Sequence, residues 1–487
     1  MAARIARLKA SGVTVLDEEG SAVVPTPAGL PIFLFPSLCR RSKGFRSGLN
    51  KIPSMLLPGL LILAVFLVMA GLMMTKRMPA LLALPFMAVA IGLIAGLFSG
   101  LPWTASEGVP CLRFYLFETI LKEGSSRLKD LMMYGIFGAI LSQVVMRQGI
   151  AERIIRVAAE YAGDRKMLLA FLITGAVAWA FLTVNGLGAA IMVGSLVLPI
   201  LMGSGLSPTY ACGLMLFGIA IGGIFNPVNL GFYVTVLKLD LEVVKRFSLG
   251  FGILLGVTAV AFLTVQGVRE KRNFAWAALE PEAVRRVPLP ALLTPVLPIL
   301  LIWIAQWPII PAFLAGILYG CLTTEPVRLI PNLTAATLEG LKDISPVLGL
   351  FMGIGMTLNA LMDPVTRQVM DPFIQAVVPT RPFTYVLFFA ALAPLTLYRG
   401  PLNLYGLGAG FAALLMNSQL LPPAAIMGAF MAVGQVQSVC DPTNTHNVWM
   451  ASFTHTSTEK ILKTTLPYVW GFVLAALIYA VTVGRVL

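Results

Sequence analysis

Asp441-Pro442-Thr443-Asn444 interrupts an apolar run that extends from residue 423 to residue 453. A similar segment, Asn226-Pro227-Val228-Asn229, interrupts the run 208 to 237, 215 residues earlier. Proline lacks a backbone N–H and clashes with the preceding helical turn, so each segment predicts a helix that breaks partway along its length. Two such breaks at matching places predict a fold built from two related halves.

The composition is that of a membrane protein. Of 487 residues, 58% are hydrophobic and 12% are charged, whereas roughly a quarter of a soluble protein is charged. The mean hydropathy is +0.87. The net charge of +13 comes from short basic clusters between apolar runs, which is where membrane proteins carry the charge that sets their topology. We therefore expect a lipid bilayer as partner, in a prokaryotic cytoplasmic membrane, and no nucleic acid.

Cysteine and histidine give no sign of a metal centre, a cofactor or an enzyme. The chain has two histidines, His446 and His455, and no CxxC pair, so zinc motifs are excluded. No nucleophile and base stand together in a recognisable catalytic motif. We expect no catalytic residue and no cofactor beyond a coupling ion such as Na⁺. The cysteines are scattered at Cys39, Cys111, Cys212, Cys321 and Cys440.

The apolar runs predict an all-α polytopic membrane protein with about ten transmembrane helices, since a bilayer core requires about 20 residues per helix. We expect a basic tail over 1–54, a first membrane repeat over 55–267, a cytoplasmic linker over 268–289 and a second repeat over 290–487. The predicted spans are 55–74, 78–98, 131–149, 208–237, 247–267, 290–306, 309–325, 347–361, 423–453 and 461–484.

Two further apolar stretches, 167–204 and 383–421, predict re-entrant hairpins. Each is interrupted near its middle by glycines and polar residues, and each arm is shorter than the stretch that a membrane-spanning helix requires. Irregular backbone inside a membrane is tolerated only where protein buries it or where it lines a watered cavity. The two hairpin tips therefore predict a central site.

Three short segments recur in the same order in the two halves. Gly186-Leu-Gly188 returns as Gly406-Leu-Gly408, and Phe137-Gly-Ala-Ile140 returns as Phe351-Met-Gly-Ile354, at offsets of 220 and 214. The Asn-Pro and Asp-Pro segments are the third pair. We expect five crossings in each half, and an odd number places the two repeats in inverted topology, as in many secondary transporters.

The positive-inside rule predicts a cytoplasmic linker but leaves the basic tail on the opposite side. Three explanations stay open. Either the chain has one more membrane crossing than predicted, or the basic tail is an exception to the rule, or translation starts at Met55.

The run from Gly149 to Arg156, the hairpin from Thr183 to Gly205 and the Asn226-Pro227 break resemble one half of the ion-transporter superfamily. This superfamily includes citrate and other di- and tricarboxylate symporters, gluconate:proton symporters and large permease subunits of TRAP transporters. The resemblance covers about 131–267 and 347–485. It implies scaffold and transport domains, elevator-type alternating access and a homodimer.

The resemblance also implies where substrate and cation bind. The residues are Thr183, Asn185 and Gly186 at the first tip, Asn403 and Gly406 at the second tip, Asn226 and Asn229 at the first break, and Asp441, Thr443 and Asn444 at the second. The Ser-Asn-Thr signature of the sodium-coupled dicarboxylate branch is absent from both tips, so the coupling ion stays open between sodium and a proton.

Arg399 is the strongest candidate from physical reasoning, because an arginine in an apolar region requires a partner or a ligand and its fork matches a carboxylate. Alternatively it reaches water or pairs with Asp441. Asp441 is predicted to carry a proton or bind sodium, or else to cap a helix. His446 is a proton-relay candidate or a packed residue. Thr445 completes the predicted substrate site.

Three functions are compatible with these residues. The first is cation-coupled symport of a small organic anion such as a di- or tricarboxylate or a sugar acid. The second is sodium/proton antiport on the same scaffold. The third is a TRAP-like permease subunit that depends on a periplasmic binding protein.

Overall fold

The computed structural model describes residues 24–25, 31–32, 52–75, 77–99, 101–103, 111–270 and 287–487. Most of the predicted basic tail and residues 271–286 of the predicted linker lie outside these ranges. Within the unit Met1–Met55, two short strands, β1 (Val24–Pro25) and β2 (Pro31–Ile32), pair antiparallel. The described part of the unit Leu56–Leu487 is helical.

The first half of the chain contains the helices α2 (Ile52–Met74), α3 (Ala80–Phe98), α4 (Leu112–Phe114), the π-helix η1 (Tyr115–Glu123), α5 (Gly124–Ser126), α6 (Lys129–Arg147), α7 (Ile150–Ala162), α8 (Lys166–Phe181), α9 (Leu187–Gly203), α10 (Pro208–Phe225), α11 (Pro227–Leu237) and α12 (Leu241–Arg269).

The second half contains the 3₁₀ segment η2 (Leu289–Leu293), α13 (Leu297–Trp303), α14 (Ile309–Thr324), η3 (Pro326–Arg328), α15 (Leu329–Leu361), α16 (Pro364–Val377), α17 (Pro382–Leu392), η4 (Ala393–Arg399), α18 (Leu407–Ser418), α19 (Pro423–Cys440), α20 (Thr445–Phe453) and α21 (Thr458–Thr482).

Eight helical segments in the described ranges are long and apolar enough to cross a membrane, and a bent pair, Thr366–Val377 with Pro382–Arg399, raises this to nine. The predicted all-helical, polytopic membrane fold is confirmed. Two predicted spans differ: 290–306 contains only η2 and the seven-residue α13, and α14 within 309–325 has 16 residues. Prolines at 290, 295 and 298 divide this stretch, because each removes a backbone donor.

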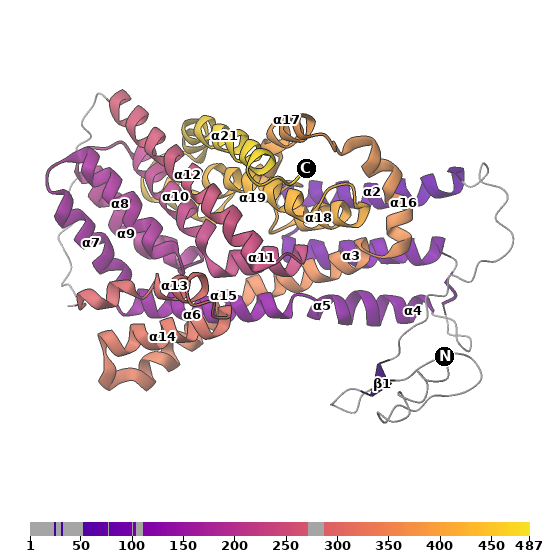
Figure 1. Ribbon diagram of the computed structural model, residues 1–487, viewed down its shortest axis with the longest axis horizontal. Helices are drawn as coiled ribbons and strands as arrows, with labels where there is room; N and C mark the ends of the chain where they lie inside the picture. The colour runs from indigo at the N-terminus through magenta and orange to yellow at the C-terminus, as the bar shows by residue number, and fades with distance from the viewer. Residues whose placement is uncertain are drawn as a thin grey trace. The chain divides into compact units, whose positions relative to one another are not determined.

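Another difference concerns the predicted span 347–361. It is the final part of α15, which has 33 residues and continues through Pro346. The first half of the helix carries the charged residues Glu339, Lys342 and Asp343, and it was not part of the predicted span. Figure 1 shows α15 running alongside α3 and α6, its principal neighbours. The buried part of α15 therefore depends on tertiary partners rather than on a continuous apolar run.

Close backbone contact joins α8 to α10. A methyl group on Gly222 would lie 2.6 Å from the carbonyl oxygen of Ala178, and one on Gly218 would lie 2.8 Å from the carbonyl oxygen of Thr174. This Gly-x-x-x-Gly spacing allows two membrane helices to approach each other closely.

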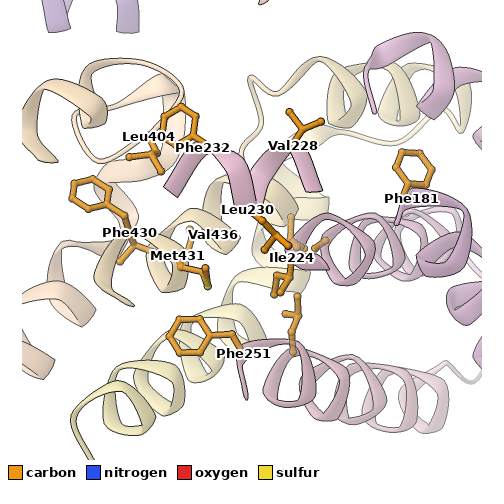
Figure 2. Packing of buried hydrophobic residues seen from close by; sticks show 14 of the residues in the cluster. Phe181, Ile224, Val228, Leu230, Phe232, Phe251, Leu404, Phe430, Met431 and Val436 are labelled. Atoms are coloured by element: carbon orange, nitrogen blue, oxygen red, sulfur yellow. The ribbon is translucent and has the colours of Figure 1, made fainter. Parts of the chain in front are cut away.

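Apolar side chains from both halves surround the α10–α11 break. In Figure 2, Ile224 and Leu230 flank the break, while Phe430 and Met431 of α19 approach from the second half. All four are at most 5% exposed. The break is therefore held inside the apolar core rather than at its edge.

We predict that Gly222→Ala lowers the melting temperature of the purified protein, because overpacking of this kind costs about 1–3 kcal/mol. Gly256→Ala in α12 is the matched control, since a methyl group there meets no atom within 4 Å. Thermal unfolding in detergent measures both variants. Equal melting temperatures would contradict the close packing of α8 on α10.

Candidate functional site

A cavity of about 480 Å³ lies between the two broken helices and the two hairpin tips. Apolar side chains such as Phe181 and Phe351 form part of its wall. Most of the predicted site residues line it: Asn185, Gly186, Asn229, Arg399, Asn403, Gly406, Asp441, Asn444, Thr445 and His446. The structure thus gathers residues from four separate stretches of the chain.

Asp441 joins the second break to the second tip. Its carboxylate is fully buried. Oδ1 accepts hydrogen bonds from the Thr443 N–H and hydroxyl, both at 2.8 Å, and from the Tyr398 N–H at 3.1 Å. Oδ2 accepts one from the Arg399 N–H at 3.4 Å. Asp441 therefore caps the start of the next segment and holds the tip at the same time.

The tip that Asp441 holds is strained. Tyr398 and Arg399 have φ angles of 56° and 57°, in the left-handed region that side chains other than glycine rarely adopt. This conformation turns two successive N–H groups toward the carboxylate, which is the geometry of an anion-binding nest. The carboxylate and the strained backbone thus stabilise each other.

Asn226 has the corresponding place at the first break. Its backbone angles, φ −63° and ψ 125°, match those of Asp441, φ −66° and ψ 115°. Its Oδ1 accepts a hydrogen bond from the Val228 N–H at 3.0 Å, and its Nδ2 donates to the Phe181 carbonyl at the first tip at 3.4 Å. Asn226 is fully buried and does not line the cavity.

The second asparagine of each segment satisfies a carbonyl at the end of the preceding helix. Asn229 Nδ2 donates to the Gly223 carbonyl at 2.7 Å, and Asn444 Nδ2 donates to the Gln437 carbonyl at 3.5 Å. The Tyr405 hydroxyl donates to Asn229 Oδ1, which ties the second tip to the first break.

His446 belongs to the same network. Its Nε2 lies 3.1 Å from Asn444 Nδ2 and 3.3 Å from the Ser438 carbonyl oxygen. The ring is therefore hydrogen-bonded on the cavity wall, within reach of the end of α19.

Two helix N-termini face the cavity. Gly186 (φ 95°) precedes α9, and Gly406 precedes α18. A methyl group on Gly186 would meet no atom within 4 Å, so this backbone is open to the cavity. Free N–H groups and the helix dipole make such an end favourable for anions. At α18 the Gly408 and Ala409 N–H groups already donate to the carbonyls of Asn403 and Gly406.

Arg399 supplies a positive charge to the same space. It is exposed and lines both the main cavity and an adjoining space of about 320 Å³ near Met74 and Met78. Its guanidinium makes no ion pair or hydrogen bond with any described residue. The alternative of a side-chain pair with Asp441 is therefore absent, because only the Arg399 backbone contacts that carboxylate.

Two other predicted residues lie off the main cavity. Thr183 is fully buried, and its hydroxyl has no partner among the described residues. Thr443 lines the adjoining space and donates to Asp441. Both are positioned to support the site rather than to face a ligand in the main cavity.

Sequence reasoning missed Asp343 and Gln143. Asp343, on α15, lines the cavity and accepts a hydrogen bond at Oδ2 from Gln143 Nε2 of α6. A signal was present: Leu341-Lys342-Asp343 repeats Leu128-Lys129-Asp130 at an offset of 213, close to the other offsets. No group of three His, Cys, Asp or Glu side chains in the described ranges is arranged to hold a metal ion. The cavity instead offers amide, hydroxyl and carboxylate oxygens.

These features define a multi-pass membrane protein with a polar cavity between two broken helices. No protein-family model matches the sequence, and no curated protein matches it. Among solved structures, the fold is similar to the YdaH transporter of Alcanivorax borkumensis, with a TM-score of 0.57 and 14% identity over 88% of this chain and 99% of that chain.

It is also similar to MtrF of Neisseria gonorrhoeae, described as illuminating a class of antimetabolite efflux pumps. The TM-score is 0.58, with 13% identity over 86% of this chain and 93% of that chain. At this identity the likeness establishes a shared fold. Membership of the ion-transporter superfamily stays a prediction.

We predict that Asp441→Asn lowers the melting temperature more than Thr443→Val does. The amide presents an NH₂ group where the carboxylate accepted backbone N–H groups, and each buried donor left unpaired costs about 1–3 kcal/mol. Thr443→Val removes only one donor to a carboxylate that keeps its other partners. Thermal unfolding of the two variants beside the wild type measures the difference. An Asp441→Asn protein as stable as the wild type would contradict the role of this carboxylate in holding the tip.

Proposed function

We propose that the protein is a secondary active transporter that couples a cation to the symport of a small organic anion. The observation that carries the proposal is Arg399, an exposed residue that lines the cavity and has no ionic partner among the described residues. Because the residue is exposed, its charge is accessible to an incoming anion. A carboxylate would fit it, because the guanidinium fork binds both oxygens.

The helix N-termini support the same substrate class. α9 and α18 both begin at the cavity wall, after Gly186 and Gly406. An anion with two charged groups could contact Arg399 with one and a helix terminus with the other. Di- and tricarboxylates and sugar acids are the classes we propose.

The difference between the two tips supports alternating access. The first tip is exposed over 185–188. The second is packed in part: Asn403 is 5% exposed and Leu407 0%, and the Tyr405 ring lies 5.0 Å from that of Phe232. Tyr398 and Arg399 of the same tip are exposed. We infer a state that is open past the first tip and closed around residues 402–407 of the second. Elevator-type movement, re-entrant hairpins in inverted repeats, a homodimer and a prokaryotic cytoplasmic membrane belong to this proposal.

Coupling by a cation is proposed from the oxygen atoms at the breaks. Asp441, Thr443 and Asn444 at the second break, with Asn226 and Asn229 at the first, provide the oxygen ligands that a dehydrated sodium ion requires. A proton is the other coupling ion, and the absence of the Ser-Asn-Thr signature leaves both in the proposal.

Export in exchange for a cation is the second candidate function. The observation that favours it is the fold shared with MtrF, whose description is that of an efflux pump. A symporter moves the anion in the same direction as the cation that runs down its gradient, whereas an exporter that exchanges the two moves the anion in the opposite direction. Uptake measured in oriented proteoliposomes therefore separates the two candidates.

We predict that Arg399→Ala lowers the apparent affinity for a transported acid about 10- to 100-fold, since hydrogen bonds to a charged group contribute about 1.5–3 kcal/mol. Arg399→Lys should recover part of the loss, because an ammonium binds as a point charge. The measurement is uptake of radiolabelled succinate, citrate and gluconate into proteoliposomes under imposed proton and sodium gradients.

Arg328→Ala is the control for this experiment, because Arg328 is also exposed but does not line the cavity. Wild-type uptake in the Arg399→Ala protein would contradict the anion-binding role.

A further inference from the structure

The second hairpin tip is braced by hydrogen bonds within itself. The Asn403 side chain accepts a hydrogen bond from the Tyr405 N–H at 3.0 Å, and the Asn403 carbonyl accepts one from the Gly408 N–H at 2.8 Å. The Asn403 N–H donates to the Gly400 carbonyl at 3.0 Å. Residues 400–408 therefore form a loop that holds its own shape and presents Tyr405 at a defined place.

Tyr405 connects this loop to the first helix break. Its hydroxyl donates to Asn229 Oδ1, and its ring lies 5.0 Å from that of Phe232 on α11. Asn229 is held in turn by the Gly223 carbonyl, which accepts from Asn229 Nδ2 at 2.7 Å. A chain of two hydrogen bonds thus joins the second tip to the end of α10, in the other half of the chain.

Tyr405 and Asn229 also stand between two spaces. One is the main cavity, and the other is a smaller space of about 110 Å³, here called the rear chamber. The rear chamber is lined by Leu404, Phe430 and Met431 (Figure 2) and by Tyr233, Gly434 and Gln435. The residues that line both spaces are Gly223, Asn229, Tyr405, Gln437 and Ser438. The bridge from Tyr405 to Asn229 is therefore part of the boundary between the two spaces.

The rear chamber suits a polar solute that leaves the main cavity. A space of this size holds several water molecules, since one water occupies about 30 Å³ in the liquid. The Tyr233 hydroxyl and the Gln435 amide add polar groups to its wall. A methyl group built on Gly434 would meet no atom of the described residues within 4 Å, so the chamber is open beside the backbone of α19.

We propose that Tyr405 is the gate of the second tip, and that its hydroxyl leaves Asn229 when the main cavity and the rear chamber join into one passage. This inference rests on the proposed function and names the residue that controls passage beyond the second tip. In the state described here the gate is closed, while residues 185–188 of the first tip are exposed.

Two anchors hold the second tip, and they differ in strength. Asp441 holds Tyr398 and Arg399 at the start of the tip through an ionised carboxylate. Tyr405 holds the other end through a hydrogen bond between two uncharged groups. Hydrogen bonds to an ionised group are roughly twice as strong as those between neutral groups. The end at Tyr405 therefore releases first, and the tip can turn about the end that Asp441 holds.

Access to the rear chamber tests the gate. A cysteine at position 434 fits the open space beside that backbone. The purified Gly434→Cys protein is treated with 2-sulfonatoethyl methanethiosulfonate, a water-soluble reagent that converts an accessible thiol to a mixed disulfide, and mass spectrometry follows the rate. We expect Tyr405→Phe to raise this rate about 2- to 10-fold, which is the factor that one neutral hydrogen bond contributes.

Three controls accompany this measurement. The parent protein gives the background, since its described cysteines are buried. Val347→Cys lines the main cavity but not the rear chamber, so Tyr405→Phe should leave its rate unchanged. Tyr319→Phe removes a tyrosine hydroxyl that donates to the Pro290 carbonyl outside both spaces, and it should not change the rate of Gly434→Cys.

A double-substitution cycle shows whether the Tyr405 hydroxyl acts through Asn229. Asn229→Ala removes the acceptor of the same hydrogen bond, so it should also raise the rate of Gly434→Cys. Tyr405→Phe should then add nothing further, because the bond is already absent. Additive effects of the two substitutions would place the action of the hydroxyl elsewhere and overturn the proposal.

Transport gives a second readout. Complete modification of Gly434→Cys should abolish uptake into proteoliposomes of whichever acid the protein carries among succinate, citrate and gluconate, because the added group fills the passage. Dithiothreitol should restore uptake by reducing the mixed disulfide. Uptake that survives complete modification places the rear chamber off the transport path and overturns the inference.

The outcomes separate this inference from the proposed function, because the modification assay needs no substrate. Equal rates with and without Tyr405→Phe overturn the gate, even where uptake of an acid supports the proposed function. A wild type that transports none of the three acids overturns the proposed function and, with it, the role of the gate in transport, whatever the modification rates.

Discussion

The backbone groups freed where two helices break inside an apolar protein must find partners within the protein itself. In a bilayer there is no water to satisfy them, and each unpaired group costs several kcal/mol. The carbonyls of Gly223 and Gln437 receive the amides of Asn229 and Asn444. Asn226 and Asp441 cap the segments that follow. The polar side chains at the breaks are thus required for the stability of the fold, independently of any role in binding.

The two capping side chains play opposite hydrogen-bonding roles toward the tips. Asn226 donates to a carbonyl at the first tip, whereas Asp441 accepts from two N–H groups at the second. The left-handed backbone at Tyr398 and Arg399 costs about 1–3 kcal/mol per residue, and hydrogen bonds to a charged acceptor of about 1.5–3 kcal/mol each offset it. An amide cap would present an NH₂ group to one of these two donors. The second half therefore needs an acid where the first half needs an amide.

Local sequence signals were sufficient for the breaks and the tips, because proline and glycine act on the backbone next to them. Asn229 and Asp441 stand next to such prolines, whereas Arg399 was found as a charge in an apolar stretch. The structure places all three on one cavity. Asp343 was missed because its position depends on how α15 packs on α6, which no local pattern encodes. The span 290–306 was wrong for a related reason: its hydrophobicity is that of a membrane helix, but its prolines divide it into shorter pieces.

The charges on the cavity wall favour the proposed symport of an anion together with a cation. Among the described residues of the wall there are one cation, Arg399, and two carboxylates, Asp441 and Asp343. The four uncharged donors to Asp441 hold its charge without cancelling it. Without ligands these three formal charges sum to minus one. A bound carboxylate group alone makes the sum more negative, and a cation bound with it restores the starting value. Adding net charge to a cavity inside an apolar protein is expensive, so in the proposed symport a cation that accompanies the anion lowers the cost of closing the cavity.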